Sequence, residues 1–298
     1  MEISEGTVPF RGRRTWYRIA GPWPAERGRP PLLVLHGGPG VPHGYLTDLD
    51  GMTSLGRTVV YYDQAGCGRS DPLDDPAEWT ADTFVEEVGA VRDGIGLDRV
   101  HLFGHSWGGM LALEYALRRP PGLESLTLAG TSASVPLLAS EVRRLMERLP
   151  AGVRETLARH EAAGTTGSPE YEEAAAAFFR LWMCRITPLP EHVAKASDAV
   201  NAELYGAMFG AEWNVTGTLK DWDVTARLGE LDLPVLVTTG RYDEITPAAV
   251  QPLVEGIRGA QWMVFEESAH LSTAEEPERY RAGLDAFLSR VESDAEHP

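Results

Sequence analysis

One serine stands in a setting suited to nucleophilic chemistry. The run HLFGHSWGGM, residues 101–110, places Ser106 between Gly104 and Gly108 in the pattern G-x-S-x-G, after a strand-like run and before a helical one. In that context the pattern predicts a sharp strand-to-helix turn whose small flanking residues prevent a collision between the two elements. The hydroxyl would be exposed beside a helix N-terminus that favours negative charge. The alternative is a glycine-rich turn with an incidental serine.

A serine hydroxyl needs a general base, and the base needs an orienting acid. On this kind of turn the order along the chain is serine, then acid, then histidine. Of the eight histidines, only His270 and His297 follow a strand that could carry the acid. His297 is the penultimate residue, where chain ends fray. We therefore predict that His270 is the base.

Asp243 is the predicted acid. It follows the strand-like run 234–239 in GRYDEITP, at the carboxyl edge of the expected sheet, where the nucleophile also lies. Asp232 precedes that strand and falls at the wrong end, while Asp221 and Asp223 are expected to serve turns or caps. The alternative for Asp243 is an aspartate in a solvated loop.

Acyl-transfer chemistry also needs N–H donors for the carbonyl oxygen that becomes charged. One predicted donor is the backbone N–H of Trp107, directly after the nucleophile. The other should come from the loop HGGPG, residues 36–40. Pro39 has no N–H, which leaves Gly37 or Gly38. A plain glycine-rich turn is the alternative.

A parallel sheet would bring these residues together. Apolar runs that read as buried strands alternate with helical patterns, which indicates an α/β fold with helices on both faces of the sheet. The predicted strands cover residues 32–35, 58–62, 99–103 and 123–130, and the predicted helices cover 80–95 and 107–118. Short β-like runs between residues 6 and 20 suggest an N-terminal hairpin.

The pattern becomes helical in the middle of the chain. Residues 136–230 read as a helical cap inserted into an α/β core formed by residues 1–135 and 231–298. Within this block, the run Ser168-Pro169-Glu170 is a favourable helix start, with a serine cap and a proline in the first helical position.

Composition narrows the class of function. The 298 residues carry a net charge of −17, which argues against nucleic acid as a partner. No apolar run is long enough for a membrane helix, and the N-terminus does not read as a signal peptide, so no membrane partner is expected. The two cysteines, Cys67 and Cys184, predict no disulfide framework and favour a cytoplasmic setting. Neither a metal nor an organic cofactor is expected.

The motifs HGGPG, DQAGCGRS, GHSWGG and GRYDEITP, with a late SAH, resemble the proline iminopeptidase family of α/β-hydrolases, which includes prolyl aminopeptidases and tricorn-interacting aminopeptidases. They appear in the family's order from His36 to about Tyr280. The resemblance implies an α/β-hydrolase fold, a mostly parallel sheet flanked by helices, with a helical cap. It also implies that Ser106, Asp243 and His270 form a catalytic triad. The oxyanion donors that it implies are Gly38 and Trp107.

The resemblance further implies that acidic residues hold the substrate's free α-amine. Glu244, directly after the triad acid, and Glu212, in the cap, match these positions. A carboxylate pair binds an ammonium group well in a partly dry pocket. The alternative is that both glutamates are solvated surface charges. Tyr205 matches a tyrosine of the family's cap.

Other residues near the motifs are assigned to packing. Cys67 is expected to be a small packed residue, because the serine turn supplies the nucleophile. His105 should point away from the nucleophile and have a steric role. Aromatic side chains at helical spacing usually belong to the core, although they could line a pocket for a proline ring. These are Phe178, Phe179, Trp182, Trp213 and Trp222.

These features predict a serine aminopeptidase that releases an N-terminal residue, proline by resemblance, from short peptides through an acyl-enzyme. The substrate would be a short peptide, or an amino acid amide or ester, with a free amine. The alternatives are an amino acid amidase, an esterase or an acyltransferase that acts on a specialised small molecule. A non-catalytic binding protein would lack a triad member, and none is missing here.

Overall fold

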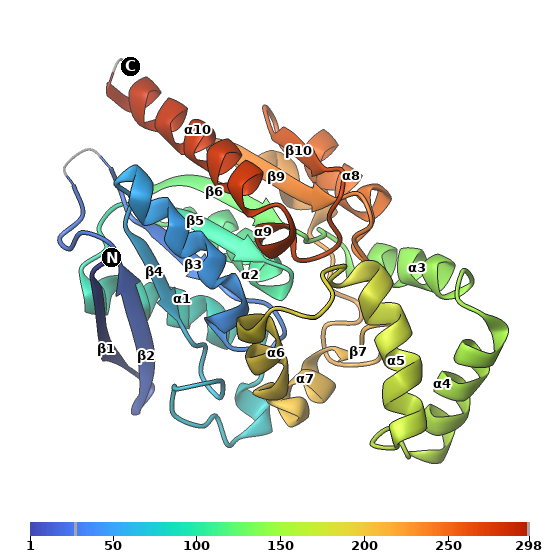
Figure 1. Ribbon diagram of the computed structural model, residues 1–298. Helices are drawn as coiled ribbons and strands as arrows, with labels where there is room; N and C mark the ends of the chain where they lie inside the picture. The colour runs from blue at the N-terminus through green and yellow to red at the C-terminus, as the bar shows by residue number, and fades with distance from the viewer. Residues whose placement is uncertain (27–28, 297–298) are drawn as a thin grey trace.

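The computed structural model describes residues 1–26 and 29–296, and His297 lies outside them. An eight-stranded sheet in the order β1-β2-β4-β3-β5-β6-β9-β10 forms the centre of the protein (Figure 1). The first two strands pair antiparallel with each other, and β2 pairs antiparallel with β4, whereas all later pairs are parallel. The strands are β1 (Ile3–Phe10), β2 (Arg13–Ala20), β3 (Leu32–Leu35), β4 (Val59–Tyr62), β5 (Val100–His105), β6 (Leu123–Ala129), β9 (Val235–Gly240) and β10 (Gln261–Phe265). The predicted α/β fold and N-terminal hairpin are confirmed.

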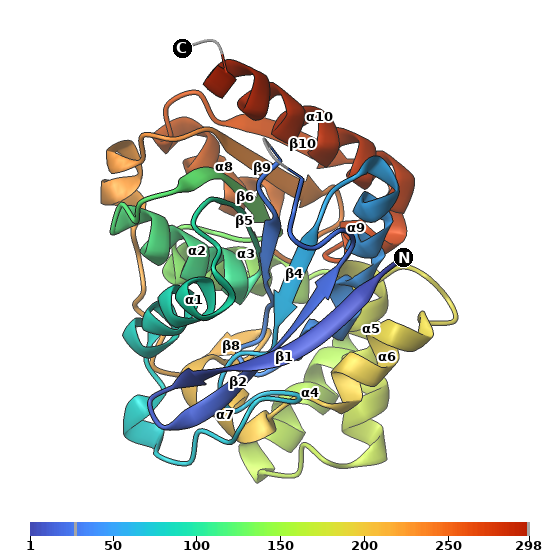
Figure 2. The same ribbon diagram turned by 90° about the vertical axis from the view of Figure 1, so that its left-hand side faces the viewer.

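Helices cover both faces of the sheet, which explains why its central strands are buried along their whole length. Every residue of β3, β4, β5 and β9 is buried. One face carries α1, α2 and α8, and the opposite face carries η1 and α10 (Figure 2). The bounds are α1 (Ala81–Ile95), α2 (Trp107–Leu117), α8 (Pro247–Gly256), η1 (His43–Leu55) and α10 (Pro277–Glu296), and two short elements are η2 (Pro76–Glu78) and α9 (Ser272–Glu275).

The inserted segment between β6 and β9 forms a separate lobe beside the carboxyl ends of the strands (Figure 1). Its helices are α3 (Val135–Met146), α4 (Ala151–Ala163), α5 (Pro169–Trp182), α6 (Glu191–Asp198), α7 (Ala202–Met208) and η3 (Thr225–Glu230). Ser168 caps α5 by accepting a hydrogen bond from the N–H of Tyr171, as its sequence signal predicts.

The cap, which the sequence predicts to be helical, also contains one short segment of β structure. After α7 the chain forms a small hairpin of β7 (Gly210–Ala211) and β8 (Asn214–Val215). Gly210 has a φ of 113°, a left-handed value that glycine adopts readily and that ends the helical path. The turn of this hairpin carries Glu212, so the break in helical structure presents one of the predicted site residues.

The cap is tied to the core at the end of α5. The backbone carbonyl of Trp182 accepts hydrogen bonds from the N–H groups of Glu244 and His270, each at 3.2 Å. The carbonyl of Met183 accepts a third bond from Leu271 N–H, also at 3.2 Å. These bonds connect one cap helix to the loops after β9 and β10. None of the helices in the described ranges is both long and apolar enough to cross a membrane.

Candidate active site

Ser106 lies on the sharp turn between β5 and α2. Its φ of 55° and ψ of −123° are unusual for a residue with a side chain, and such strain is typical of a nucleophile held on a strand-to-helix turn. The backbone is fixed on both sides: Ser106 N–H donates to Ala129 O at 2.9 Å, and Thr131 Oγ1 donates to Ser106 O at 2.8 Å. The turn is therefore anchored to the neighbouring strand β6.

The glycines around Ser106 are required by close approach of the backbone. A Cβ atom on Gly104 would lie 2.2 Å from the carbonyl oxygen of Gly108. A Cβ atom on Gly108 would lie 2.2 Å from the carbonyl oxygen of Leu35. No larger residue fits at either position unless the strand and helix separate, which is the reason that the motif needs glycine here.

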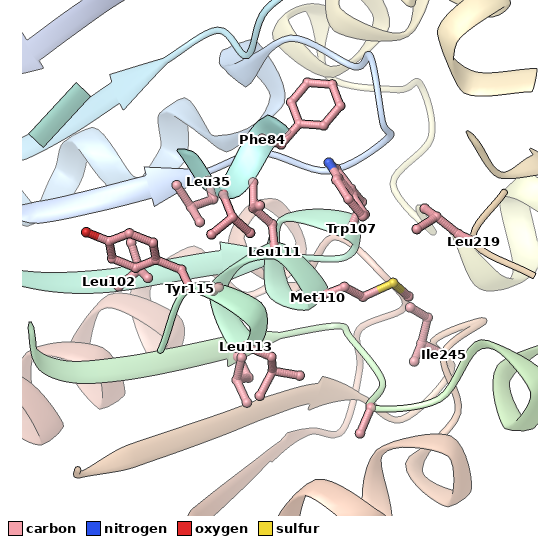
Figure 3. Close-up of a cluster of buried hydrophobic side chains, with 14 of the residues drawn as sticks. Leu35, Phe84, Leu102, Trp107, Met110, Leu111, Leu113, Tyr115, Leu219 and Ile245 are labelled. Atoms are coloured by element: carbon pink, nitrogen blue, oxygen red, sulfur yellow. The ribbon is translucent and has the colours of Figure 1, made fainter. Parts of the chain in front are cut away.

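The helix that follows the turn is almost entirely buried. Trp107 packs edge-to-face against Phe84 of α1, with ring centroids 5.9 Å apart. Figure 3 shows Met110 pointing toward Leu219 of the cap and Ile245 of the loop that carries the predicted acid. The helix that follows the nucleophile turn is therefore packed in an apolar cluster shared with the cap and with the loop of the predicted acid.

His270 and Asp243 form a buried hydrogen-bonded pair. The Nδ1 of His270 lies 2.8 Å from Oδ1 of Asp243, and that oxygen also accepts from Ile245 N–H at 2.8 Å. Burial by itself would lower the pKa of His270, but the charge and hydrogen bond of Asp243 outweigh it and hold the pKa above 6.5. A Cβ on Gly130 would lie 3.1 Å from both Asp243 Oδ2 and His270 Nδ1, so the end of β6 closely covers the pair.

A pocket of about 640 Å³ joins the core loops to the cap. Ser106, His270 and Gly38 line its core side, and Glu212 and Tyr205 line its cap side. Most of the remaining lining is apolar and includes Ala176, Phe179, Met183, Ile186, Leu189 and Val193 of the cap. The predicted nucleophile, the predicted base and Glu212 therefore face one cavity, whereas Glu244 is buried outside its lining.

Two N–H groups near Ser106 are placed to receive a charged oxygen. Trp107 begins α2, so its N–H belongs to the first turn, where backbone donors have no partner within the helix. In the HGGPG loop, Gly37 N–H already donates to Tyr45 Oη at 2.7 Å. Gly38, with a φ of 112°, lines the pocket. Between the two glycines that the sequence left open, Gly38 is the one with an N–H that this bond does not occupy.

Glu212 and Glu244 meet where the cap closes over the core. Glu244 is only 3% exposed, which contradicts the alternative that it is a surface charge. Burial raises the pKa of Glu244 well above 4.5, and the neighbouring Glu212 and Asp243 carboxylates raise it further. Glu212 is half-buried and accepts a hydrogen bond from the hydroxyl of Tyr205. Among the described residues, Glu244 Oε2 has no hydrogen-bond partner.

The two neighbouring carboxyl groups would be stabilised by a cation. Two carboxyl groups in contact cannot both ionise cheaply away from water, so the pair favours a protonated form when it is alone. An ammonium group between them would remove this penalty and supply donors for the free oxygens. In the described part of the chain, no group of three or more His, Cys, Asp or Glu side chains is arranged to hold a metal ion.

Two residues near the nucleophile turn make contacts for which the sequence predicted no role: Tyr45, outside every quoted motif, and Gln64, within the DQAGCGRS motif. Gln64 Oε1 accepts from the indole N–H of Trp107 at 2.9 Å, and Gln64 Nε2 donates to His36 O at 2.9 Å. Gln64 thus links the nucleophile turn to the HGGPG loop. Tyr45 contacts the same loop from η1. Both residues are several positions outside the G-x-S-x-G and HGGPG patterns, and only the tertiary fold brings them in.

The expectations about packing residues meet mixed outcomes. Cys67 is buried, and burial raises the pKa of its thiol well above 9, consistent with an inert packed residue. Phe178 and Trp182 are buried in the core, but Phe179 and Trp213 line the pocket. The purely steric role predicted for His105 is incomplete, because its ring nitrogens lie 2.9 Å from Tyr45 Oη and 3.0 Å from His270 O.

Comparisons with known proteins identify the family of the chain. A family model described as the alpha/beta hydrolase fold matches residues 30–277. The proline iminopeptidase of Saccharolobus solfataricus is 35% identical over 296 residues, which cover 98% of this chain and 94% of that protein. The chain belongs to the proline iminopeptidase family of α/β-hydrolases. The predicted resemblance is confirmed, and membership identifies the chain as a hydrolase.

Solved structures of similar proteins extend the likeness to the whole proline iminopeptidase fold. The crystal structure of a proline iminopeptidase from Mycobacterium smegmatis is 42% identical, with a TM-score of 0.90 over 98% of this chain and 100% of that one. The crystal structure of VinJ is 40% identical, with a TM-score of 0.93 over 97% of this chain and 99% of that one. The cap is therefore part of the shared architecture.

Proposed function

We propose that this protein is a serine aminopeptidase that releases an N-terminal residue, proline in particular, from short peptides. The observation that carries the proposal is the buried Glu244 beside Glu212, because Glu212 lines the pocket that also contains Ser106 and His270. A buried carboxyl pair is costly unless a cation joins it. The α-ammonium group of a peptide is such a cation, and it lies two bonds from the carbonyl carbon that the serine must attack.

The proposed reaction uses Ser106, His270 and Asp243 as a catalytic triad. His270 takes the proton of Ser106 Oγ as this oxygen forms a bond to the first carbonyl carbon. The N–H groups of Trp107 and Gly38 stabilise the resulting oxyanion. When the C–N bond breaks, His270 gives its proton to the departing amine and an acyl-enzyme remains. Water then attacks the ester through His270, which releases the amino acid and restores Ser106.

Proline fits the proposed amine site in two respects. Its ring nitrogen, when protonated, carries two N–H donors, one for each carboxyl group of Glu212 and Glu244. Its ring is apolar and suits a pocket lined by Phe179 and Met183. Tyr205 supports the site by donating to Glu212, which orients that carboxylate. The relatives named as proline iminopeptidases support the same substrate.

Three chromogenic anilides test the proposal: free-amine proline, free-amine alanine and N-acetyl-proline. Fast hydrolysis of the free-amine proline anilide, with loss on acetylation, is the expected result. A preference for alanine would retain the aminopeptidase and remove the proline specificity. Equal rates with and without the acetyl group would overturn the role of the glutamates, since an amide carries no charge to bind.

A second candidate is an amidase or esterase that cleaves an amino acid from an apolar small molecule, or an acyltransferase that passes it to an amine. The size and apolar lining of the pocket favour this alternative, because about 640 Å³ is room for a drug-sized ligand. Prolyl amides of alkylamines of increasing length, compared with prolyl-glycine, separate the candidates. Rates that rise with alkyl length favour the apolar substrate, and transfer to added amine reveals an acyltransferase.

The proposed setting is the cytoplasm, with a small molecule rather than a nucleic acid or membrane as the partner. Cys67 and Cys184 are free and buried in the described structure, which suits a reducing compartment. The net charge of −17 would repel a phosphate backbone and attract substrates that carry a free amine.

A further inference from the structure

A chain of buried hydrogen bonds connects the HGGPG loop to the loop that carries His270. Gly37 N–H lies 2.7 Å from Tyr45 Oη, Tyr45 Oη lies 2.9 Å from His105 Nδ1, and His105 Nε2 lies 3.0 Å from His270 O. All of these side chains are buried. Tyr45 and His105 line the pocket together with Ser106, which directly follows His105 in sequence.

The chemistry of the end groups fixes the direction of every bond. The carbonyl of His270 can only accept, so His105 Nε2 must carry a hydrogen. Burial lowers the pKa of His105 well below 6.5, and the nearby His270 lowers it further, so the ring is neutral and Nδ1 is an acceptor. The hydroxyl of Tyr45 therefore donates to Nδ1 and accepts from Gly37 N–H. Each of the three bonds therefore joins one donor to one acceptor.

This arrangement constrains both partners that Ser106 needs. Tyr45 holds Gly37 N–H, which fixes the peptide between His36 and Gly37, one residue before Gly38, and leaves Gly38 N–H as the donor in that loop for the oxyanion. At the other end, His105 holds the backbone of His270, with the two imidazole rings 4.5 Å apart. A neutral His105 does this without placing a second positive charge beside the His270 ring when that ring takes the serine proton.

We propose that Tyr45 and His105 are positioning residues that hold the Gly38 N–H and the His270 imidazole in register on either side of Ser106. The inference rests on the proposed roles of Ser106, His270 and Gly38, and it assigns a function to two residues that do not contact the substrate's reacting atoms in that mechanism. A difference of about 1 Å in the position of a catalytic group is enough to change a rate substantially.

Three variants separate positioning from packing. Tyr45→Phe keeps the ring and removes the hydroxyl that joins Gly37 to His105. His105→Leu removes both hydrogen bonds of the imidazole, whereas His105→Gln can still donate to His270 O and accept from Tyr45. Tyr61→Phe is the matched control, because Tyr61 is a buried tyrosine whose hydroxyl donates to Asp50, outside the site.

Two substrates and thermal unfolding provide the measurements. The free-amine proline anilide reports the whole proposed reaction, and p-nitrophenyl acetate reports acyl transfer without an amine. Loss of a direct oxyanion donor lowers kcat by about 10²–10³-fold, so we expect a displaced donor to cost about 10-fold for Tyr45→Phe and His105→Leu, with KM nearly unchanged. His105→Gln should recover most of this loss, and Tyr61→Phe should change stability without changing kcat.

The outcomes are decisive for the inference and distinct from those for the proposed function. If Tyr45→Phe loses no more kcat than Tyr61→Phe on either substrate, or if His105→Gln is as slow as His105→Leu, the positioning role is overturned. If the wild type ignores the anilide while ester hydrolysis still depends on Ser106 and Tyr45, the aminopeptidase proposal fails and the positioning role stands.

Discussion

The two sides of the active-site pocket are built in different ways. On the core side, Ser106, His270 and Asp243 lie on short turns at the carboxyl edge of the sheet, held by backbone hydrogen bonds and closely packed glycines. On the cap side, Glu212 lies on a short hairpin and Tyr205 on a two-turn helix, and both are only partly buried. The proposed bond-breaking chemistry therefore depends on a rigid sheet edge, whereas the proposed recognition of the amine combines Glu244 at that edge with Glu212 on the insertion.

Removal of the predicted nucleophile should have the largest effect of the substitutions on either side of the pocket. Ser106→Ala should lower kcat by about 10⁴–10⁶-fold on anilide and ester substrates alike, because it acts on the chemistry that both share. Initial rates with both substrates, and labelling by a fluorophosphonate, measure the effect. Unchanged hydrolysis of either substrate by a homogeneous preparation would place the chemistry at another residue.

Substitution of the two glutamates that we propose bind the amine should affect recognition alone. Glu212→Gln and Glu244→Gln each remove a charged acceptor, and hydrogen bonds to charged groups contribute about 1.5–3 kcal/mol, so kcat/KM for the free-amine proline anilide should fall about 10- to 150-fold. Hydrolysis of p-nitrophenyl acetate should remain near the wild-type rate. An equal loss on both substrates would mean that the glutamates serve the chemistry itself.

One glycine-to-alanine substitution in the core and one in the cap should have opposite effects on the free energy of unfolding. Gly108→Ala places a Cβ 2.2 Å from Leu35 O and should destabilise the protein by about 1–3 kcal/mol or more. Gly152→Ala, in α4 of the cap, meets no atom within 4 Å and should stabilise by about 0.5–1 kcal/mol, because alanine is the better helix former. Denaturant unfolding gives both values. Similar losses at the two sites would contradict the difference in rigidity.

The pH dependence should also differ between the two kinds of substrate. Burial holds the pKa of Glu244 well above 4.5, so its carboxylate is lost as the pH falls through that raised value. The kcat/KM for the free-amine anilide should fall with an additional slope, at most about 10-fold per pH unit, which the ester does not share. Both substrates report the pKa of His270. Identical profiles for anilide and ester would contradict the role of the Glu244 carboxylate in binding the amine.

The same shift has a consequence for stability. The folded pKa of Glu244 is above its unfolded value, so the folded state binds more protons and wild-type stability should fall as the pH rises from about 4.5 through the raised pKa. Glu244→Gln should remove this loss and unfold at a higher temperature near neutral pH. Thermal unfolding of the two proteins at several pH values is the measurement. A glutamine variant that melts lower at neutral pH would show that the charge stabilises the fold.

The sequence predicted the core far better than the cap. Strand β3 begins and ends at Leu32 and Leu35, as its apolar run predicts, because a strand buried on both faces leaves a continuous pattern. The turn around Ser106 was also predictable, because its close backbone contacts require the glycines of the G-x-S-x-G motif. The hairpin that begins at Gly210 has no such motif, because a single glycine after a helical pattern predicts the end of the helix but does not specify a hairpin.

Contacts between segments that are distant in the sequence could not be predicted from local sequence patterns. Tyr45 and Gln64 reach the site only because η1 and the loop after β4 fold against the nucleophile turn. The burial of Glu244 could be expected from resemblance but not from its own neighbours in sequence, which include an arginine and an exposed tyrosine. Burial depends on the cap, whose position above the core no periodicity encodes.

The carbonyl group of Trp182 constrains how this enzyme could be redesigned. It accepts N–H groups from both the loop of the acid and the loop of the base, and Met183 O accepts another beside them. A cap exchanged with that of a relative would have to retain residues 182–183 in place, or the graft would release two catalytic loops while it altered substrate choice. In a chimera, one exchange point should therefore lie before the last turn of α5, so that residues 182–183 of this chain are retained. An exchange at the junctions of the insertion with the sheet would replace them.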